Sequence, residues 1–397
     1  MADEKIIRMI NGNQWADCIR VRARIDEITF DPMRAQENFL LPLLRDNSRT
    51  EYGRKHRFDR IGNIKEFQQQ VPVTSYDDYI PYITRMVNNK EKNLLTNYRI
   101  THFTNTVSNR QIPLSLMGEQ VVYEYSFNTT LYMGLYNGRA FDGYLLNLLD
   151  CHIEKVGEKV SRGTLLGHIF QSRKALYDKV SFPPIEILTT PDGIGSIHLQ
   201  AFYALSQENI TYVLCDACND FIKVLQYIMQ NWDILANDIA NTEDAERAEY
   251  VRKIMQSNPT FSELISSLWP KLHSIVIFNN RDVDSGLNLL RDYCSSKIQI
   301  IYNGIVAPEG VISTSLSIDN ADSILLPDSM FYEFRRMEDR NYNHLLTMNQ
   351  VELCNNYELV ITNLSGFYRY RTGKTVCIVG QYHNTPMVRL AYQQLEI

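Results

Sequence analysis

The chain has 397 residues, of which 44% are hydrophobic and 22% are charged, as is ordinary for a globular protein. Its formal net charge of -6 gives no support to nucleic-acid binding, which usually needs a basic surface. No apolar run approaches the ~18 residues of a membrane span, and acidic residues stand where a signal peptide would be apolar. The seven cysteines, an odd number at irregular spacing, fit a reducing compartment better than a disulfide framework. We therefore expect a cytoplasmic protein that binds neither nucleic acid nor membrane.

The first part of the chain is predicted to be helical. Apolar residues recur at spacings of three and four over residues 6–46. Asp31 and Pro32 separate two helices there, and Pro42 predicts a kink or restart in the second. Further on, a proline-broken extended segment leads into a helix that begins near Thr74 or Ser75.

The middle of the chain is predicted to alternate strands and helices. Residues 144–149 and the run that ends at Phe278 are apolar and strand-like, whereas residues 197–239 have a helical stripe of large apolar side chains. Cys215 and Cys218 form a lone CxxC pair, and a structural zinc site would need a second pair at suitable spacing. We therefore expect both thiols to lie in a hydrophobic core.

Residues 98–115 contain a hydroxyl-rich turn. Thr104, Thr106 and Ser108 are followed by Arg110 and then by an Ile-Pro pair. A loop that cradles phosphate usually contains glycine, because its backbone N–H groups must approach the phosphate oxygens closely and often at positive φ. No glycine lies between Thr104 and Pro113. The hydroxyls and the cation leave phosphate binding open, although such a turn is more often a solvated loop.

The segment 366–376, GFYRYRTGKTV, lies between two apolar, β-rich runs. We predict strand, glycine-bounded turn and strand, with the two glycines giving the backbone the freedom that sharp bends need. Alternation at period two would place Phe367 and Arg369 on one face and Tyr368 and Tyr370 on the other.

Several stretches resemble the Gretchen Hagen (auxin-responsive) family of acyl-acid–amide synthetases, a branch of the adenylate-forming enzymes. The likeness rests on TEYGRKH and VPVTSYDDYIPYI within residues 50–83, on WPKL before Phe278, on residues 298–313, on the FYEF run within 325–334, and on GFYRYRTGKTV. The resemblance implies an α/β fold, the large N-terminal domain of the adenylate-forming (ANL) enzymes, with sheets flanked by helices and a small β-barrel-like part. We expect residues 1–397 to form this one domain. The family's small mobile C-terminal lid domain is expected to be absent, because too few residues follow Val376 to build it.

The resemblance also implies an ATP site. The positions concerned are Thr104, Thr106, Ser108 and Arg110 for the phosphates, Ile305 for adenine, Pro308 and Glu309 for the phosphates and Mg²⁺, and Tyr370, Arg371 and Lys374 for the ribose. Glu309 would be the metal ligand, and Glu333 of the FYEF run is expected to be structural. Lys374 stands where the family has an aspartate that accepts hydrogen bonds from the ribose, and an ammonium has donors only. Ile305 replaces a tyrosine that stacks on adenine, and Pro308 replaces a hydroxyl residue and offers no donor.

These departures give three hypotheses about function. The first is a catalytically impaired pseudoenzyme that binds a small carboxylate-type ligand or a protein partner, with no cofactor. The second is an active, divergent ligase that uses ATP and Mg²⁺ to join a carboxylic acid to an amine or amino acid, with a separate protein supplying or replacing the lid domain. The third is a structural subunit of an assembly, which a tyrosine-rich surface would suit.

Overall fold

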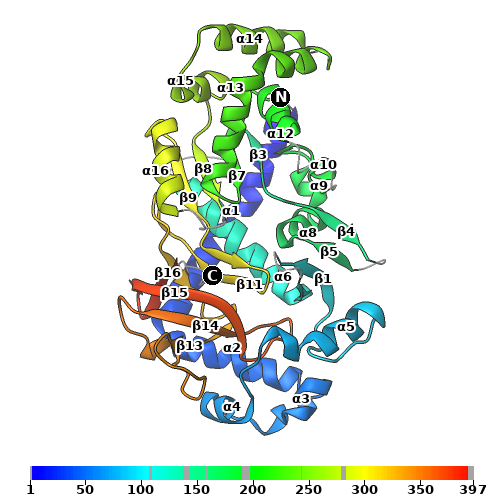
Figure 1. Ribbon diagram of the computed structural model, residues 1–397, viewed down its shortest axis with the longest axis vertical. Coiled ribbons are helices and arrows are strands. Elements are labelled where there is room, and N and C mark those ends of the chain that lie inside the picture. Colours follow the sequence, from blue (N-terminus) through cyan, green and yellow to red (C-terminus); the bar gives the residue numbers. More distant parts are fainter. Residues whose placement is uncertain are drawn as a thin grey trace.

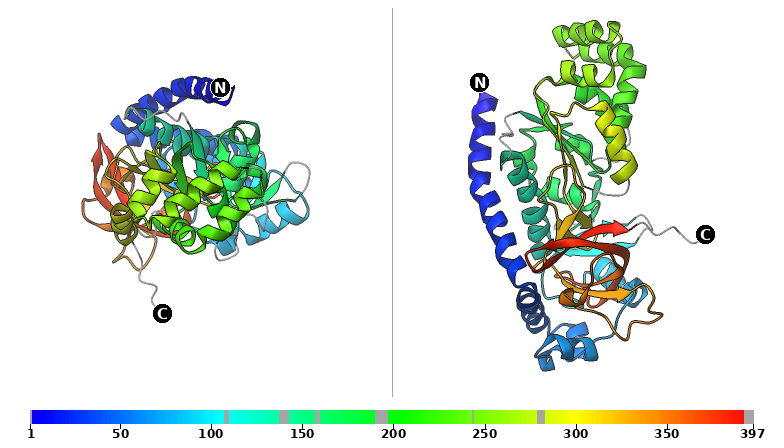
Figure 2. Two further views of the ribbon diagram at one scale, coloured as in Figure 1. Left: turned by 90° about the horizontal axis from the view of Figure 1, so that it is seen from above. Right: turned by 90° about the vertical axis from the view of Figure 1, so that its left-hand side faces the viewer.

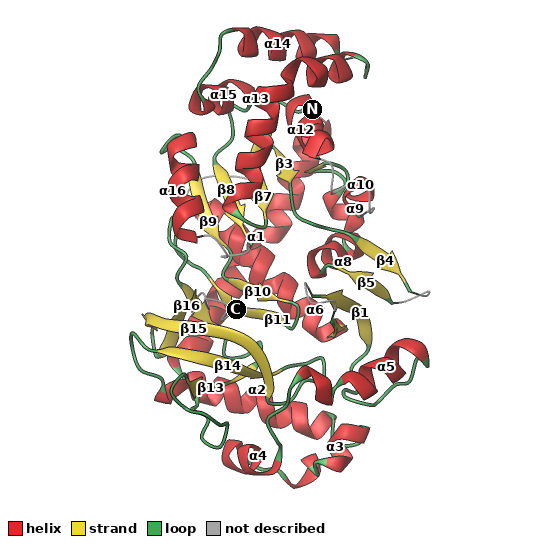
Figure 3. Cartoon of the chain, viewed as in Figure 1, coloured by secondary structure: helices red, strands yellow, loops and turns green. Residues whose placement is uncertain are grey.

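The computed structural model describes residues 2–106, 110–136, 143–156, 160–189, 197–242, 244–278 and 283–391. The molecule is elongated, with helices at both ends and three sheets between them (Figures 1 and 3). The α/β architecture that the resemblance implies is confirmed by this arrangement of sheets and helices.

The central sheet has five parallel strands in the order β6-β3-β7-β8-β9. They are β3 (Tyr144–Asn147), β6 (Ser181–Phe182), β7 (Ile210–Cys215), β8 (Ser274–Ile277) and β9 (Gln299–Tyr302). On β7, Val213 belongs to one hydrophobic cluster and Leu214 to another, so both faces of the sheet are covered. Parallel strands that are buried on both faces need continuous apolar runs, and such runs correctly predicted β3 and β8.

Helices cover the two faces of this sheet. One face packs against α12 (Ile197–Ser206), α13 (Cys218–Ala240), α14 (Ala245–Gln256), α15 (Phe261–Leu268) and α16 (Val283–Tyr293). The other packs against α6 (Leu116–Val122), a π-helical stretch η3 (Tyr123–Asn128), α7 (Thr129–Tyr136), α8 (Leu165–Ser172), α9 (Lys174–Tyr177) and α10 (Ile185–Leu188). Cys215 and Cys218 are both fully buried in the first cluster, as predicted.

The N-terminal helices lie along the molecule. Helix α1 (Ala2–Phe30) runs along one side of the molecule, and α2 (Pro32–Asp46) comes next in the chain (Figure 2). The predicted break between them is confirmed, since the Asp31 carboxylate caps α2 by accepting from the Arg34 backbone N–H at 3.1 Å. Helix α2 continues through Pro42. In the part of the chain that the structure describes, no helix has both the length and the apolar character needed to cross a membrane.

Short helices follow at the lower end of the molecule in Figure 1. They are α3 (Glu51–Lys55), η1 (Phe58–Arg60), α4 (Ile64–Gln70), η2 (Tyr76–Asp78) and α5 (Ile80–Asn88). The predicted helix start is confirmed at Ser75, whose backbone N–H donates to the Asp78 carboxylate at 2.8 Å.

Two further sheets complete the fold. The small sheet has the order β2-β1-β5-β4, with β1 (Ile100–Asn105), β2 (Gln111–Ser115), β4 (Ile153–Lys155) and β5 (Ser161–Gly163). The large antiparallel sheet has the order β10-β11-β12-β16-β15-β14-β13, and its β13–β14 connection includes a short helix, η4 (Met348–Gln350). Its strands are β10 (Ile305–Ala307), β11 (Gly310–Thr314), β12 (Ser323–Leu325), β13 (Phe331–Arg336), β14 (Asn356–Thr362), β15 (Tyr370–Tyr382) and β16 (Thr385–Ala391). This sheet stands where a barrel-like part was expected, and β10 and β13 are its two edges.

The predicted alternation within 366–370 is wrong. Strand β15 begins only at Tyr370, and the residues before it form an irregular bend with Gly366 at φ 101° and Arg369 at φ 49°. Phe367, Tyr368, Arg369 and Tyr370 are all buried rather than divided between two faces of a strand.

Candidate functional site

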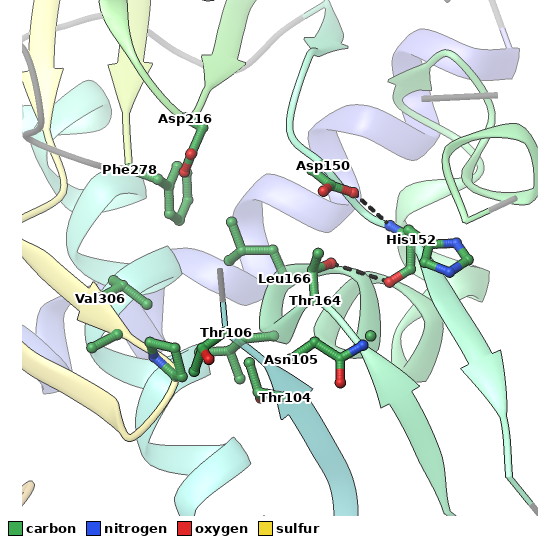
Figure 4. A pocket seen from close by; sticks show the side chains of 14 residues that line it. Thr104, Asn105, Thr106, Asp150, His152, Thr164, Leu166, Asp216, Phe278 and Val306 are labelled. Atoms are coloured by element: carbon green, nitrogen blue, oxygen red, sulfur yellow. Dashed lines mark hydrogen bonds between the residues drawn. The ribbon is translucent and has the colours of Figure 1, made fainter. Parts of the chain in front are cut away.

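A pocket of about 400 Å³ lies at the carboxyl ends of the central parallel strands (Figure 4). We call it the acidic pocket; its lining is Thr104, Asn105, Thr106, Asp150, His152, Gly163, Thr164, Leu165, Leu166, Asp216, Phe278, Val306, Ala307 and Pro308. Asp150, Asp216 and Phe278 follow β3, β7 and β8 respectively. Ligands of open α/β sheets bind beyond the carboxyl ends of their strands, so this position makes the pocket the leading candidate for a binding site.

Strand β1 supplies the threonine wall of the acidic pocket. Thr104 is 3% exposed, and its hydroxyl has no hydrogen-bond partner in the described residues. The Thr106 hydroxyl accepts from the Arg110 backbone N–H at 3.0 Å, and the Thr106 N–H donates to the Arg110 carbonyl at 2.9 Å. Two hydrogen bonds between Thr106 and Arg110, one of them to the Thr106 hydroxyl, therefore join the two ends of this turn. Ser108 lies outside the described residues.

The charges that line the acidic pocket are negative. Asp150 and Asp216 reach it from neighbouring strands, and none of its described lining residues is a lysine or an arginine. The Asp150 carboxylate accepts from the His152 backbone N–H at 3.0 Å, which fixes the turn after β3. The Arg110 guanidinium instead lies over the Tyr76 ring, 5.2 Å from its centroid. Among the lining residues that the structure describes, the ionisable side chains that an anion would meet therefore include two carboxylates and no lysine or arginine.

Glu309 and Lys374 meet beside the β10–β11 turn. The Lys374 Nζ donates to Glu309 Oε2 at 3.1 Å, and the glutamate side chain is 4% exposed. Tyr370 is buried nearby; burial raises the pKa of its phenol, the negative charge of Glu309 adds to this rise, and Arg110 opposes it. Seven of the predicted residues therefore lie at or near one place, with Thr104, Thr106 and Pro308 in the pocket lining, Glu309 paired with Lys374, and Arg110 beside Tyr370.

Two other predicted residues lie elsewhere. Arg371 pairs with Glu358 at 3.4 Å and its guanidinium lies 4.4 Å from the centroid of the Tyr342 ring. Ile305 is 3% exposed in a hydrophobic cluster, and it is not among the residues that line the acidic pocket. The structure therefore does not bring these two side chains to the pocket.

The bend before β15 is a structural element. The Arg369 guanidinium forms two-pronged hydrogen bonds with Glu333 at 2.9 Å and donates to the carbonyls of Gln68 and Val71. Both charged side chains are buried, and each is satisfied by the other and by backbone groups. Glu333 thus has the structural position that was expected, and Arg369 anchors α4 to the antiparallel sheet.

A buried polar network that sequence analysis did not predict lies beside the site, where it ties β5 to β1. The Ser161 hydroxyl lies 2.8 Å from His102 Nδ1 and 2.9 Å from His168 Nδ1, and His168 Nε2 lies 2.8 Å from Glu119 Oε2. Arg173 and Ser172 donate to the other carboxylate oxygen of Glu119. The network joins β1 to β5 and α8 to α6. Its members lie far apart in the sequence, so spacing could not reveal them.

Asp150, His152 and Asp216 were also missed, although a signal existed for the first two. For Asp150 and His152 this signal is their place just after the predicted strand 144–149, since polar side chains at the carboxyl ends of parallel strands gather at one edge of the sheet. Asp216 had no such signal, because it follows β7, which lies within residues 197–239, and the prediction of helix there is wrong for β7. Within the described residues, no group of three or more histidine, cysteine, aspartate or glutamate side chains is arranged to hold a metal ion.

Comparison with known proteins gives two matching sequence families over most of the chain. The model of the GH3 family N-terminal domain matches residues 21–299, and that of the GH3 family central domain matches residues 323–393. A probable indole-3-acetic acid-amido synthetase of Oryza sativa subsp. japonica is 24% identical over 413 residues, which cover 92% of this chain and 69% of that protein. A 4-substituted benzoates-glutamate ligase of Arabidopsis thaliana is 19% identical over 407 residues, which cover 94% and 70% of the two chains.

Solved structures agree on the fold. The acyl acid amido synthetase GH3.15 superposes with a TM-score of 0.78 at 20% identity, over 94% of this chain and 70% of that one. The same synthetase in complex with 2,4-DB gives a TM-score of 0.78 over 93% and 69%. The described residues therefore adopt the fold of the corresponding part of such a synthetase.

Proposed function

This chain belongs to the GH3 family, and from that premise we propose that it is a pseudoenzyme, which keeps the large adenylate-forming domain but does not form acyl-adenylates by itself. The family resemblance implies a site for ATP and Mg²⁺ at the positions described above. Three features of the structure support the view that these residues do not fit that pair.

The ion pair between Lys374 and Glu309 is the observation on which the proposal rests. The resemblance makes Glu309 a metal ligand, but its carboxylate already accepts from an ammonium at 3.1 Å. A Mg²⁺ bound to the same carboxylate would have to share it with that ammonium, and two cations held by one carboxylate repel each other. The lysine therefore takes the place of a metal as the partner of this carboxylate.

The charge of the acidic pocket supports the same proposal. ATP has several negative charges, and an ATP site gathers cations and backbone N–H groups around them. Here Asp150 and Asp216 line the pocket, and Pro308 has no N–H to offer at the β10–β11 turn. The described part of this lining therefore offers a triphosphate neither a lysine nor an arginine.

The position of Ile305 is the third feature. The resemblance places an adenine platform there, but the side chain is packed in a hydrophobic cluster away from the lining of the pocket. A base could not stack on it without disturbing the core.

Calorimetry with Mg-ATP and carboxylate-dependent pyrophosphate exchange test the proposal. We expect no magnesium-dependent binding of ATP and no exchange with a panel of aliphatic and aromatic acids. Saturable, magnesium-dependent ATP binding or exchange with any acid would overturn the proposal. It would establish instead the second hypothesis, an active divergent ligase, which the two pocket threonines, Thr104 and Thr106, favour.

A charge-inverting variant locates the cause. Lys374→Asp removes the ammonium and places a second carboxylate opposite Glu309, so we expect the variant to bind Mg²⁺ measurably where the wild type does not. Lys253→Asp, at an exposed lysine of α14, is the matched control and should gain no such binding. Equal Mg²⁺ binding by the wild type and Lys374→Asp would show that Lys374 does not block the metal.

A further inference from the structure

A second and larger cavity, of about 760 Å³, is lined by residues of α5, of the loop that joins α5 to β1, and of the small sheet and its β4–β5 connection. We call it the cationic pocket; its lining includes Lys90, Lys92 and Arg99 from the loop, and Leu94, Phe103 and Val160 from its floor. None of these residues lines the acidic pocket. Its volume is within the usual range of about 300–1,000 Å³ for small-molecule sites.

The three cations of this pocket have no ion-pair partner within the described residues. The one carboxylate among the lining residues, Glu91, is already paired with Arg85, whose Nη2 lies 2.6 Å from Glu91 Oε2. All three cations are exposed, so their side chains are free to turn toward a ligand. Among the lining residues that the structure describes, positive charge is therefore in surplus.

The floor beneath these cations is apolar. Leu94 and Phe103 are 5% and 4% exposed, and Val160 is half-buried. An apolar group that covered such a floor would gain about 25 cal/mol for each Å² removed from water. Because the cations and the apolar side chains line the same cavity, one ligand could contact both.

We propose that the cationic pocket binds a small amphipathic anion, a carboxylate with an apolar tail. The tail would cover Phe103 and Val160, and the carboxylate would accept hydrogen bonds from the lysine ammonium groups and the Arg99 guanidinium. The proposal does not depend on whether the acidic pocket binds nucleotide, because the two pockets share no lining residue.

Decanoate is the probe, used below its micelle concentration and measured by calorimetry on the full chain. We expect saturable binding that weakens as salt is added, because exposed charges are screened. Decanol, which keeps the tail without the charge, and decyltrimethylammonium, which inverts the charge, should each bind at least about tenfold more weakly, a difference of about 1.4 kcal/mol. No saturation by decanoate in the millimolar range, or binding of decanol as tight as that of decanoate, would overturn the proposal.

Variants place the site. Lys90→Gln with Lys92→Gln and Arg99→Gln should weaken decanoate binding about tenfold or more while leaving the melting temperature unchanged, since these side chains are exposed. Lys253→Gln, on the distant helix α14, is the matched control and should bind like the wild type. Val160→Asn should weaken decanoate binding by removing apolar contact with the tail, while all three cations stay in place. Unchanged binding in the triple variant would overturn the proposal, because decanoate would then bind elsewhere.

Discussion

The acidic pocket and the cationic pocket lie on either side of one short strand. Phe103 lines the cationic pocket, whereas the next residue, Thr104, lines the acidic one, because successive side chains of a strand point to opposite faces. The acidic pocket takes its carboxylates from the ends of parallel strands, and the cationic pocket takes its lysines from the α5–β1 loop. The charged residues named for each pocket therefore come from segments that connect helices and strands. Strand β1 separates a pocket lined by carboxylates from a pocket lined by cations.

The two pockets have one support in common. His102, on the same strand, reaches Ser161 of β5, and the chain of contacts continues through His168 to Glu119. This network holds β1 against β5, and β1 forms a wall of each pocket. Substitutions in the network should therefore disturb both pockets, whereas substitutions in the lining of one pocket should disturb that pocket alone.

Removing the end of the network should have the largest effect. In Glu119→Ala, His168 and Arg173 lose a buried carboxylate, and we expect the free energy of unfolding to fall by about 3–5 kcal/mol. Urea unfolding measures the loss, and decanoate binding should weaken with it. Glu186→Ala is the control, since that side chain is 83% exposed, and its cost should stay within about 0.5 kcal/mol. Equal losses in the two variants would contradict a supporting role for the network.

How far the sequence predicts these features depends on the range of the contacts involved. The break at Asp31, the buried strands β3 and β8, and the buried Cys215 and Cys218 all follow from local pattern and were predicted correctly. The bend at Arg369 was predicted wrongly as regular strand. Its left-handed backbone is held by Glu333, 36 residues away, and by Gln68, 301 residues away, and no local pattern reports such partners.

The candidate site shows the same division. Motif likeness brought Thr104, Thr106, Pro308, Glu309 and Lys374 to attention, and the structure places all of them at or beside the β10–β11 turn and the end of β1. The ion pair between the last two could not be foreseen, since it joins residues 65 positions apart. The cationic pocket was not predicted either, because its lining joins the loop before β1 to Val160, which lies far along the chain.

The second-largest expected effect is a loss of stability at acid pH, through His102 and Glu119 of the shared network. Burial is the largest cause that lowers the pKa of His102, to about 3, and His168 adds to it. Burial alone would raise the pKa of Glu119, but hydrogen bonds from His168, Ser172 and Arg173 outweigh it and lower that pKa to about 2. Between about pH 6.5 and 3 the unfolded chain binds a proton at His102 that the folded chain does not, so stability falls as pH decreases, by up to about 1.4 kcal/mol per pH unit. Glu119 adds to the fall below about pH 4.5.

The variant His102→Gln isolates the contribution of His102 to the pH dependence of stability. It cannot titrate, so its free energy of unfolding should depend less steeply on pH than that of the wild type between about pH 6.5 and 4. Urea unfolding at several pH values measures both slopes. Parallel slopes would mean that His102 is protonated in the folded chain as readily as in the unfolded one.

Gly163→Ala should damage the acidic pocket selectively. Gly163 has φ +142°, and a Cβ there would lie 2.2 Å from the His152 carbonyl oxygen, which other residues of the pocket wall fix in place. We expect a loss of about 2–3 kcal/mol, with decanoate binding kept, because the clash is with β4 rather than with the floor of the cationic pocket. Gly373→Ala, at φ +69° with open space around it, should cost only about 1 kcal/mol. Loss of decanoate binding in Gly163→Ala would show that the two pockets are not independent.

The smallest expected effect separates two cations of the segment that resembles a ribose motif. Lys374→Met leaves the buried Glu309 carboxylate without its partner, so the free energy of unfolding should fall by about 1–2 kcal/mol. Arg371→Met removes a cation that is 45% exposed beside Glu358, and its cost should stay below about 0.5 kcal/mol, because solvent screens that pair and Arg335 also reaches Glu358. Urea unfolding of both variants at neutral pH makes the comparison. If Arg371→Met cost more than Lys374→Met, the pair beside the acidic pocket would be the weaker one, and an incoming cation could displace the lysine from Glu309.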